Sequence, residues 1–325
     1  MSSVHGRPPD RRPEALILEL PALVSRLIPA QLSEGRLSFV AVHYAKLVFL
    51  AFRERSRDPD FVVTVGSEEE VAKLHDVLSK LHREIPALTP ESLATAPLPD
   101  GRFIHVQSAI PGLPWYSLAG SLRHDARRRL HAKALDVLRK LHGAIDAIPA
   151  WHSQISPSGE LRRQFDLSAS NGITLSPAAR QLAESCIEHL AGLGEFVSHW
   201  QHGDYCASNL MVAGTDLRIF DFDEFGMTAM PLHDQFALAF SVHELASADG
   251  VRRPVAEEVH ACIAAELRAK PALASHVRGL LVHHLLWNVN LHHGQPARVG
   301  RGKAALRDLE EFASVPWDYV PPSAA

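Results

Sequence analysis

Acidic and amide side chains gather in one stretch of the sequence, from Trp200 to Gly226. His202, Asp204 and Asn209 lie close together in it, and Asp221 follows after two short apolar runs. Converging carboxylates are unfavourable unless a cation or a proton compensates them. An amide and a carboxylate suit Mg²⁺, whose coordination phosphate oxygens and water complete. A separate carboxylate beside the metal can receive a hydroxyl proton, so the stretch has the groups that phosphoryl transfer requires.

The same stretch predicts a β-hairpin. The runs "NLMVA" and "LRIFD" alternate apolar and polar residues, and "GTD" between them is a good tight turn. Asp204 and Asn209 precede the first strand, and Asp221 ends the second. Because a hairpin brings its two ends side by side, we expect the three side chains to converge.

The whole pattern resembles the aminoglycoside phosphotransferase/choline kinase superfamily, which has a protein-kinase-like fold. The resemblance rests on His202-x-Asp204-x-x-x-x-Asn209, the hairpin and Asp221, and Gly203 favours the branch that acts on small molecules. The segments "LDVLRKLHGA", "FIHVQSAIPGLPW" and "MPLHDQFALA" are similar to the helix before the catalytic loop, the hinge strand and the segment behind the active site. The resemblance covers roughly residues 35–250 and is strongest in the second half.

The resemblance implies a kinase that uses ATP or GTP with Mg²⁺ and phosphorylates a hydroxyl of a sugar, a polyol or an aminoglycoside-like molecule. Its catalytic residues would be Asp204 as the base and His202 as a support of the loop. Asn209 and Asp221 would hold the metal, and Gln107 and Ala109, with the third strand, would contact the nucleotide. Asp234 would brace the catalytic loop from the next helix, whereas Asp223 is either a metal or acceptor ligand or a solvated charge.

The expected fold class is α+β. It is a bilobal protein-kinase-like fold with a small antiparallel-sheet N-lobe and a larger, mainly helical C-lobe. Residues 1–14 are rich in Pro and Arg and are predicted to be disordered. The N-lobe is placed at 15–109, the C-lobe with the catalytic loop at 110–316 and an extended tail at 317–325.

Hydrophobic periodicity supports this plan. In the N-lobe it predicts helices at 14–28 and 67–82, the second capped by Ser67, and strands at 36–42, 46–52, 61–65 and 102–109. In the C-lobe it predicts helices at 126–145, 176–197, 254–269, 276–293 and 303–313.

The N-lobe departs from the family pattern at the nucleotide phosphates. Thr64 occupies the third-strand position where similar kinases carry a Lys or Arg, and the partner glutamate aligns with Leu74, or with Glu70 one turn earlier. Either the chain is a pseudokinase that acts as a binding or regulatory module, or another cation serves, for which Lys46 is the candidate. Because clustered carboxylates without a cation are destabilising, Asp204, Asn209 and Asp221 together favour an active enzyme.

Histidines near the C-terminus raise the question of a second metal site. His283, His284, His292 and His293 share a helical stretch without a nearby cysteine. A zinc site needs more ligands than one helix face offers. A polar wall of the acceptor pocket is favoured over a metal site, and a surface-exposed helix end is favoured over both.

Composition excludes several classes of protein. The formal net charge of −4 is too small to indicate a nucleic acid or an anionic membrane surface as partner. Three cysteines far apart do not make a disulfide framework, and Cys206 is expected to be a small packing residue without an activated thiolate. No export signal or membrane span is recognised, so the expected location is the cytoplasm. Oligomeric state is not predicted.

Overall fold

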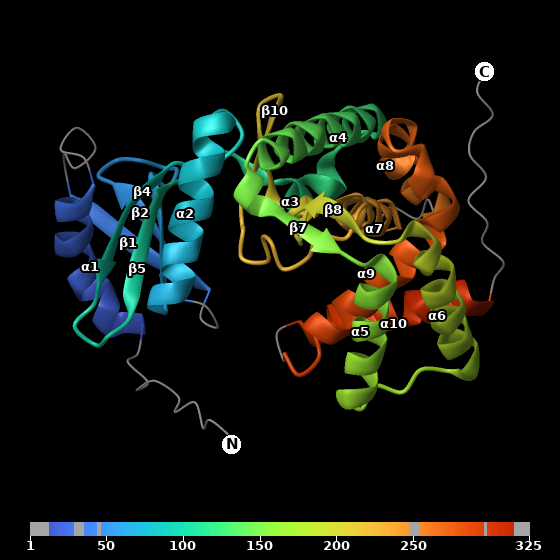
Figure 1. Cartoon of the computed structure of the whole chain (residues 1–325). Helices are drawn as coiled ribbons and strands as arrows, with labels where there is room; N and C mark the ends of the chain where they lie inside the picture. The colour runs from blue at the N-terminus through green and yellow to red at the C-terminus, as the bar shows by residue number, and fades with distance from the viewer. Residues whose placement is uncertain (1–12, 29–35, 44–46, 248–253, 296–297, 315–325) are drawn as a thin grey trace. The chain divides into compact units, whose positions relative to one another are not determined.

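The computed structural model describes residues 13–28, 36–43, 47–247, 254–295 and 298–314. The chain forms two compact units, Met1–Leu113 with Met211–Phe220, and Pro114–Leu210 with Asp221–Ala325. Figure 1 shows the order of the elements along the chain. Lys46, the predicted tail and nearly all of the predicted disordered start lie outside the described residues.

A five-stranded antiparallel sheet forms the centre of the N-terminal unit. Its strands are β1 (Leu37–His43), β2 (Leu47–Arg53), β3 (Phe61–Gly66), β4 (Ser92–Pro97) and β5 (Phe103–Ser108). Their order in the sheet is β1-β2-β3-β5-β4, and Thr64 on β3 pairs with Val48 and with His105. The four strands that the sequence predicts are present.

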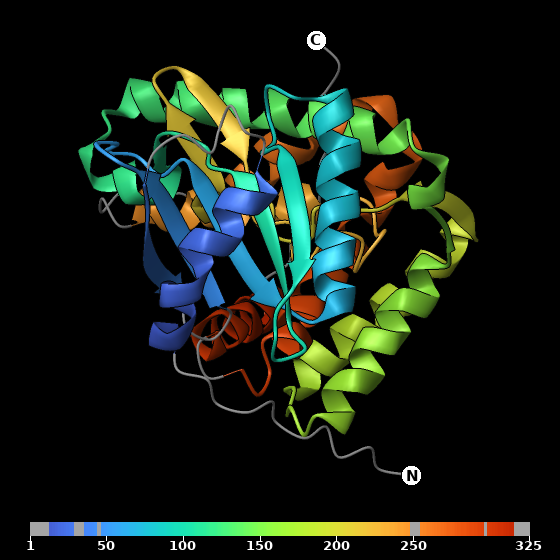
Figure 2. The ribbon, with the colours of Figure 1, turned by 90° about the vertical axis from the view of Figure 1, so that its left-hand side faces the viewer.

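Helix α1 (Pro13–Leu27) covers one face of this sheet (Figure 2). Its Leu16, Leu20 and Val24 are buried in one apolar cluster with Phe49 and Val63 of the sheet. Because side chains alternate along a strand, Thr64 lies on the opposite face from Val63. The N-terminal helix that the sequence predicts is therefore confirmed, and it closes the apolar face of the sheet.

Helix α2 (Glu68–Glu84) packs against the other face. Its His75 contacts the Ser92 hydroxyl, which in turn contacts His105 on β5. The helix begins with a capping box: Ser67 Oγ accepts from the backbone N–H of Glu70, and the Glu70 carboxylate accepts from the Ser67 backbone at 2.8 Å. The predicted Ser67 cap is confirmed.

Strand β4 was not predicted. It lies at the edge of the sheet, and its residues "SLATAP" are mostly half-exposed. An edge strand with alanines and a terminal proline lacks the β-branched apolar alternation by which the other strands are recognised.

The hairpin predicted around Gly214 is present. It consists of β9 (Leu210–Ala213) and β10 (Asp216–Ile219), and β9 also pairs with the short strand β6 (Leu113–Pro114). Gly214 has φ 62°, a left-handed conformation that the tight turn requires and glycine adopts without strain. The middle of the hairpin belongs to the N-terminal unit, whereas its two flanks, at Leu210 and Asp221, belong to the C-terminal unit.

The C-terminal unit is mainly helical. Its helices are α3 (Trp115–Leu118), α4 (His124–Asp146), α5 (Pro157–Ser170), α6 (Pro177–Leu190), α7 (His233–Ser247), α8 (Val255–Ala269), α9 (Val277–Leu291) and α10 (Val299–Ser314). Helix α9 is buried on nearly all sides and packs against α5, α6, α7 and α10. A helix that is apolar all round is expected at the centre of a helical layer.

Two helix boundaries and one small sheet in this unit differ from the prediction. Helix α6 ends at Leu190 rather than at 197, because Gly194 (φ 63°) turns the chain into strand β8 (Phe196–His199). Strand β8 pairs with β7 (His152–Ile155), a two-stranded sheet that the sequence did not predict. Helix α10 begins at Val299 rather than at Lys303, one turn earlier. That extra turn carries Arg301.

Within the described residues, no helix combines the length and the apolar character needed to cross a membrane.

Candidate active site

The loop from His202 to Asn209 is held by a buried carboxylate from the next helix. Asp234, in the first turn of α7, accepts the backbone N–H of His202 at 2.9 Å and that of Gly203 at 3.0 Å. Its Oδ2 also accepts from His142 Nε2 on α4 at 2.9 Å. Burial raises the pKa of Asp234, but the His142 hydrogen bond and nearby histidines outweigh it and hold the pKa well below its usual range. Asp234 is therefore an ionised brace, as predicted.

Gly203 is required by close packing. It has φ 91°, and a Cβ at this position would lie 2.5 Å from the carbonyl oxygen of Glu224. Side chains rarely adopt this backbone conformation, and no side-chain atom fits at such a distance. The glycine in "HGD" thus lets the loop pass directly over the segment that follows the hairpin.

Asp204 points its carboxylate at two partners. Asn209 Nδ2 donates to Asp204 Oδ2 at 3.0 Å and to its backbone carbonyl at 2.9 Å. Arg301 Nη1 donates to the same Oδ2 at 3.0 Å. Burial raises the pKa of Asp204, but the Arg301 guanidinium, a hydrogen bond with Cys206 and the charge of His202 together outweigh this, and the pKa lies below its ordinary value. The group is therefore a carboxylate at neutral pH.

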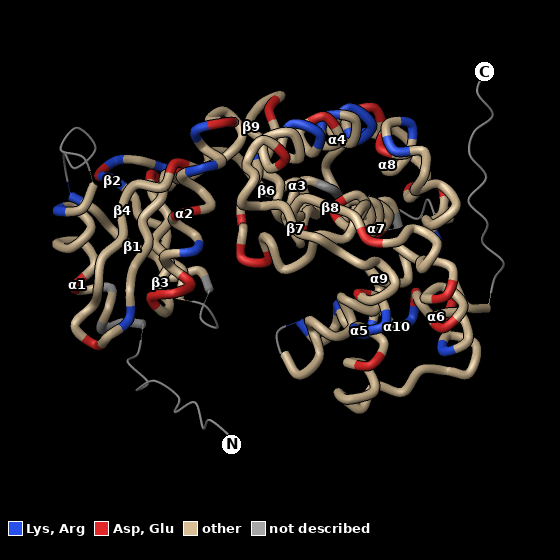
Figure 3. The backbone as a smooth tube through the Cα atoms, viewed as in Figure 1, with Lys and Arg blue, Asp and Glu red and all other residues tan. Residues whose placement is uncertain are grey.

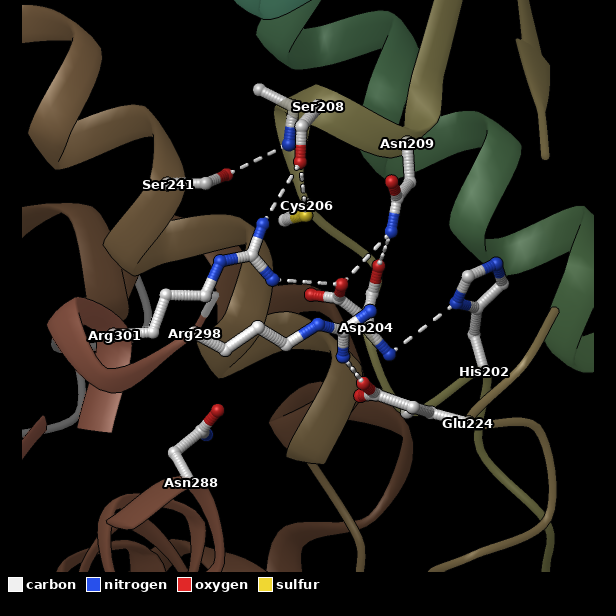
Figure 4. Close-up of polar contacts among 12 residues, drawn as sticks. His202, Asp204, Cys206, Ser208, Asn209, Glu224, Ser241, Asn288, Arg298 and Arg301 are labelled. Atoms are coloured by element: carbon white, nitrogen blue, oxygen red, sulfur yellow. Dashed lines mark hydrogen bonds and ion pairs between the residues drawn. The ribbon is translucent and has the colours of Figure 1, made fainter. Parts of the chain in front are cut away.

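A second ion pair lies beside the first (Figure 4). Arg298 binds the carboxylate of Glu224, which is buried. Burial and the charge of Asp204 raise the pKa of Glu224 to about 7, and the guanidinium of Arg298 opposes that rise. Arg298 and Arg301 come from the start of α10 and from the turn before it, so one short segment supplies both cations.

Arg298, Arg301 and Glu224 were not predicted from the sequence as site residues. The only signals were the arginines three residues apart in "RVGR" and the acid that follows "DFD". Neither pattern shows that the two segments meet.

Asp221 follows the hairpin with φ 61°, a left-handed conformation that is uncommon outside glycine, and its side chain is half-buried. Because Asn209 directs its Nδ2 at Asp204, its Oδ1 is the atom left to bind a metal. Among the described residues, no three His, Cys, Asp or Glu side chains form a metal-binding group. One amide and one carboxylate nevertheless fit Mg²⁺, since phosphate oxygens and water complete its coordination. Asp223 is half-buried, and its role stays open.

His202 and Cys206 lie inside the loop. His202 is buried, its Nδ1 accepts from the backbone N–H of Asp204 at 3.4 Å, and its ring packs at 4.7 Å from that of Phe222. It therefore contacts the loop itself, where the sequence analysis placed its supporting role. Cys206 is buried, and burial raises the pKa of its thiol well above the usual range, so it carries no thiolate.

The histidines of α9 are not a surface-exposed helix end, so that prediction was wrong. His283, His284 and His292 are buried, because α9 lies at the centre of the helical layer, and only His293 is exposed. Burial lowers the pKa of His283 and His284 well below the usual value, and both are neutral.

One of these histidines reaches the catalytic loop. Asn288 Nδ2 donates to His284 Nε2 at 3.2 Å, and His284 Nδ1 lies 3.4 Å from His233 Nδ1. His233 Nε2 lies 3.2 Å from the carbonyl oxygen of Gly203, which only accepts. The proton of His233 is therefore on Nε2, and that of His284 is on Nδ1. These hydrogen-bonded side chains, Asn288, His284 and His233, support the loop and are not a metal site.

The residues predicted to bind nucleotide lie in the N-terminal unit. Thr64 is 7% exposed, Gln107 is half-buried on β5, and the backbone N–H of Ala109 donates to the Asp60 carbonyl at 2.9 Å. The Glu70 carboxylate accepts hydrogen bonds from Ser67 in the cap of α2. It is therefore not oriented to form an ion pair with a cation on the strand. Nucleotide binding by Lys46, Thr64, Gln107 and Ala109 stays a prediction.

The sequence model of the phosphotransferase enzyme family matches residues 49–234, more than half of the chain. The chain belongs to this family. The matched region ends at Asp234, so it includes the whole braced loop. A comparison with curated protein sequences gives no match.

Solved phosphotransferase structures share the fold. A GDP complex of aminoglycoside 2'-phosphotransferase-IIIa has a TM-score of 0.60 at 13% identity, over 90% of this chain and 98% of that one. A thermostable mutant of APH(4)-Ia with ADP and hygromycin B has a TM-score of 0.57 at 12% identity, over 86% and 95% of the two chains. The predicted α+β, protein-kinase-like fold and the aminoglycoside phosphotransferase/choline kinase resemblance are confirmed. Family and fold support a phosphotransferase that acts on a small molecule.

Proposed function

We propose that the chain transfers the γ-phosphoryl group of ATP or GTP to a hydroxyl of a small molecule such as a sugar, a polyol or an aminoglycoside-like compound. The observation that carries this proposal is the state of Asp204. It is an ionised carboxylate on a loop that a buried aspartate holds rigidly, and Asn209 is oriented by a direct hydrogen bond to it.

The reaction follows from these groups. Because Arg301 and Asn209 both bind Oδ2 of Asp204, we assign Oδ1 to the acceptor hydroxyl. The hydroxyl oxygen forms a bond to the γ-phosphorus, the bond from that phosphorus to the bridging oxygen breaks, and the hydroxyl proton goes to Asp204. The nucleoside diphosphate leaves. Mg²⁺ bound by Asn209 Oδ1 and Asp221 would neutralise charge on the phosphates.

Asp204 need not be a strong base in this reaction. Phosphoryl transfer has a loose transition state in which the hydroxyl loses its proton late, so positioning matters more than basicity. A carboxylate whose pKa is lowered by Arg301 is suited to that task.

Known structures support the choice of co-substrate. The similar aminoglycoside phosphotransferases were solved with GDP, or with ADP and hygromycin B. A nucleotide and a hydroxyl-bearing acceptor are therefore the partners that we propose for this chain. Its three cysteines are free thiols in the structure, which fits the proposed cytoplasmic location.

One observation favours a second candidate function, that of a pseudokinase acting as a binding module. Thr64 replaces the strand cation, and the described strands offer no other at that position. The compact carboxylate site argues against it, since a binding module has no need of an ionised Asp204 beside an oriented metal ligand.

Two measurements test the proposal. The first is a thermal shift with ATP or GTP, with and without Mg²⁺, on the wild type and on Asp221→Ala. A ligand that binds only the folded state stabilises it, so the wild type should gain a Mg²⁺-dependent shift and Asp221→Ala should lose it. The second is a phosphate-transfer screen over sugars, polyols and aminoglycosides. A wild-type protein with no nucleotide shift and no transfer would establish the pseudokinase.

A further inference from the structure

A partly exposed guanidinium lies beside Asp204. The Arg301 side chain is 48% exposed, and its guanidinium lies 3.0 Å from Asp204 and 3.5 Å from the Ser208 hydroxyl. A guanidinium has five N–H donors in one plane, so these two contacts leave donors on Arg301 for another acceptor. In Figure 4 both arginines extend toward Asp204 and Glu224 from the same side.

The neighbouring acid, Glu224, does not occupy the remaining donors of Arg301. The Glu224 side chain is 8% exposed and is already paired with Arg298. The Asp204 carboxylate is paired with Arg301 and is needed for the hydroxyl. Because Arg301 lies 3.0 Å from Asp204 and is the more exposed of the two, an acceptor hydroxyl on Asp204 brings the rest of the acceptor close to this guanidinium.

We infer that the acceptor carries a phosphate or carboxylate group, which Arg301 binds while the acceptor hydroxyl engages Asp204. This inference rests on the proposed phosphotransferase function and narrows its acceptor. An oxyanion matches the planar donors of a guanidinium and makes charge-assisted hydrogen bonds to them. An ammonium group at the same place would be repelled by Arg301, and the two acids in contact with these arginines, Asp204 and Glu224, are already paired. Amine-rich acceptors are therefore disfavoured.

A series of related sugars that differ in charge tests the inference by binding alone. Glucosamine, glucose, glucuronate and glucose 6-phosphate are titrated by calorimetry into the full chain at one ionic strength, with Mg²⁺ and AMP-PNP present and absent. We expect one or both anions to bind at least about tenfold more tightly than glucose, and glucosamine to bind most weakly. The glucuronate and glucose 6-phosphate arms distinguish a carboxylate from a phosphate.

Variants assign the preference to Arg301. Arg301→Ala should lower the affinity for the anion about tenfold and leave glucose within about twofold, whereas Arg301→Lys should keep part of the preference. Arg307→Ala is the matched control, because Arg307 lies on the same helix with a side chain that is 74% exposed. AMP-PNP affinity should not change in Arg301→Ala. If it fell while anion affinity persisted, Arg301 would serve the nucleotide and the inference would be wrong.

The binding series also separates this inference from the proposed function. Tighter binding of glucosamine than of either anion would overturn the inference, and so would the failure of both anions to bind at about 10 mM. Neither result concerns phosphoryl transfer, which the screen with neutral and cationic acceptors measures independently. Conversely, a protein that binds the anions through Arg301 but transfers no phosphate would retain the subsite and lose the proposed function.

Discussion

The two units of this chain distribute charge in opposite ways. Along the five strands of the N-terminal antiparallel sheet, β1 to β5, the only Lys, Arg, Asp or Glu is Arg53, and it is paired with Asp60. Figure 3 shows these strands almost entirely in tan, the colour of uncharged residues. In the C-terminal unit, by contrast, Asp204, Glu224, Arg298 and Arg301 form two adjacent ion pairs. The proposed acceptor site is therefore dense in charge, whereas the sheet expected to hold the nucleotide has almost none.

The charged groups that phosphoryl transfer would use therefore lie mainly in the C-terminal unit. The buried carboxylate of Asp234 and the arginines at the start of α10 hold the groups around Asp204 in place. Breaking these buried contacts costs free energy. The sheet is stabilised mainly by its apolar face, which packs against α1. Substitutions in the two units test this contrast.

The largest effect is expected at the base. Asp204→Asn removes the proton acceptor but keeps the shape of the side chain, so turnover should fall by roughly 10²–10⁴-fold. Nucleotide affinity should stay close to that of the wild type, because Asn209 and Asp221 are unchanged. Steady-state kinetics and nucleotide titration measure the two quantities. A variant with the wild-type rate would show that Asp204 is not the base.

The brace should have the largest effect on stability. Asp234→Asn leaves the His202 and Gly203 N–H groups and His142 without their shared carboxylate, and we expect a loss of about 3 kcal/mol in the free energy of unfolding. Asp136→Asn on the surface of α4 is the control. Asp136 is 40% exposed and pairs with Lys140, so its loss should cost less than about 1 kcal/mol.

The cost at Asp234 should depend on pH. Its pKa in the folded protein lies below that of an unfolded aspartate, which is about 3.9. The stabilisation is therefore complete above about pH 4 and is lost as pH falls toward the folded pKa. Denaturant unfolding of wild type and Asp234→Asn should show the largest gap at neutral pH and a smaller gap at pH 3. A gap that stayed constant would mean that Asp234 is not ionised.

The brace itself was predictable, and this shows how far sequence reasoning reaches. Asp234 follows a recognisable segment, and the hairpin, the four strongly apolar strands and most helices have local periodicity. Each of these features is specified within a few adjacent residues. The loop that carries His202, Asp204 and Asn209 was found for the same reason, since its spacing is local.

Contacts between distant segments were not predictable in this way. Arg301 and Asp204 are 97 positions apart, and an arginine near the start of a helix has no local feature that distinguishes a site residue from a solvated charge. The histidines of α9 were wrongly assigned to the surface, because residue type suggested exposure while the packing of α9 on all sides buried them. Long-range packing decided both cases.

Gly203 belongs to the locally recognisable "HGD" motif, but the reason for the glycine is its contact with the distant Glu224. Its replacement should have an intermediate effect. Gly203→Ala places a Cβ against the Glu224 carbonyl in a left-handed conformation, so we expect a loss of about 2 kcal/mol in stability together with slower turnover. Gly143→Ala in α4 is the control, since a Cβ there meets nothing within 4 Å. Helix propensity predicts that this control is neutral or stabilising. Equal behaviour of the two variants would exclude close packing at Gly203.

The smallest effect is expected in the N-terminal unit, at the residue proposed to replace the missing strand cation. Lys46 lies outside the described residues, but it is two positions before Val48, which pairs with Thr64 on β3. Neighbouring strands are about 4.8 Å apart, a separation that a lysine side chain can bridge. Loss of one charge-assisted contact to phosphate predicts that Lys46→Ala raises the nucleotide KM about tenfold and lowers kcat.

Two further variants make the Lys46 prediction decisive. Arg55→Ala is the control, because Arg55 is an exposed turn residue and its loss should leave the nucleotide KM unchanged. Thr64→Lys, introduced into Lys46→Ala, returns a cation to the strand position that similar kinases use. It should recover part of the lost affinity, although Thr64 is 7% exposed and a lysine there needs the phosphate to compensate its burial. If Lys46→Ala bound nucleotide like the wild type, the sheet would hold its nucleotide without a cation. The difference in charge between the two units would then have no exception at Lys46.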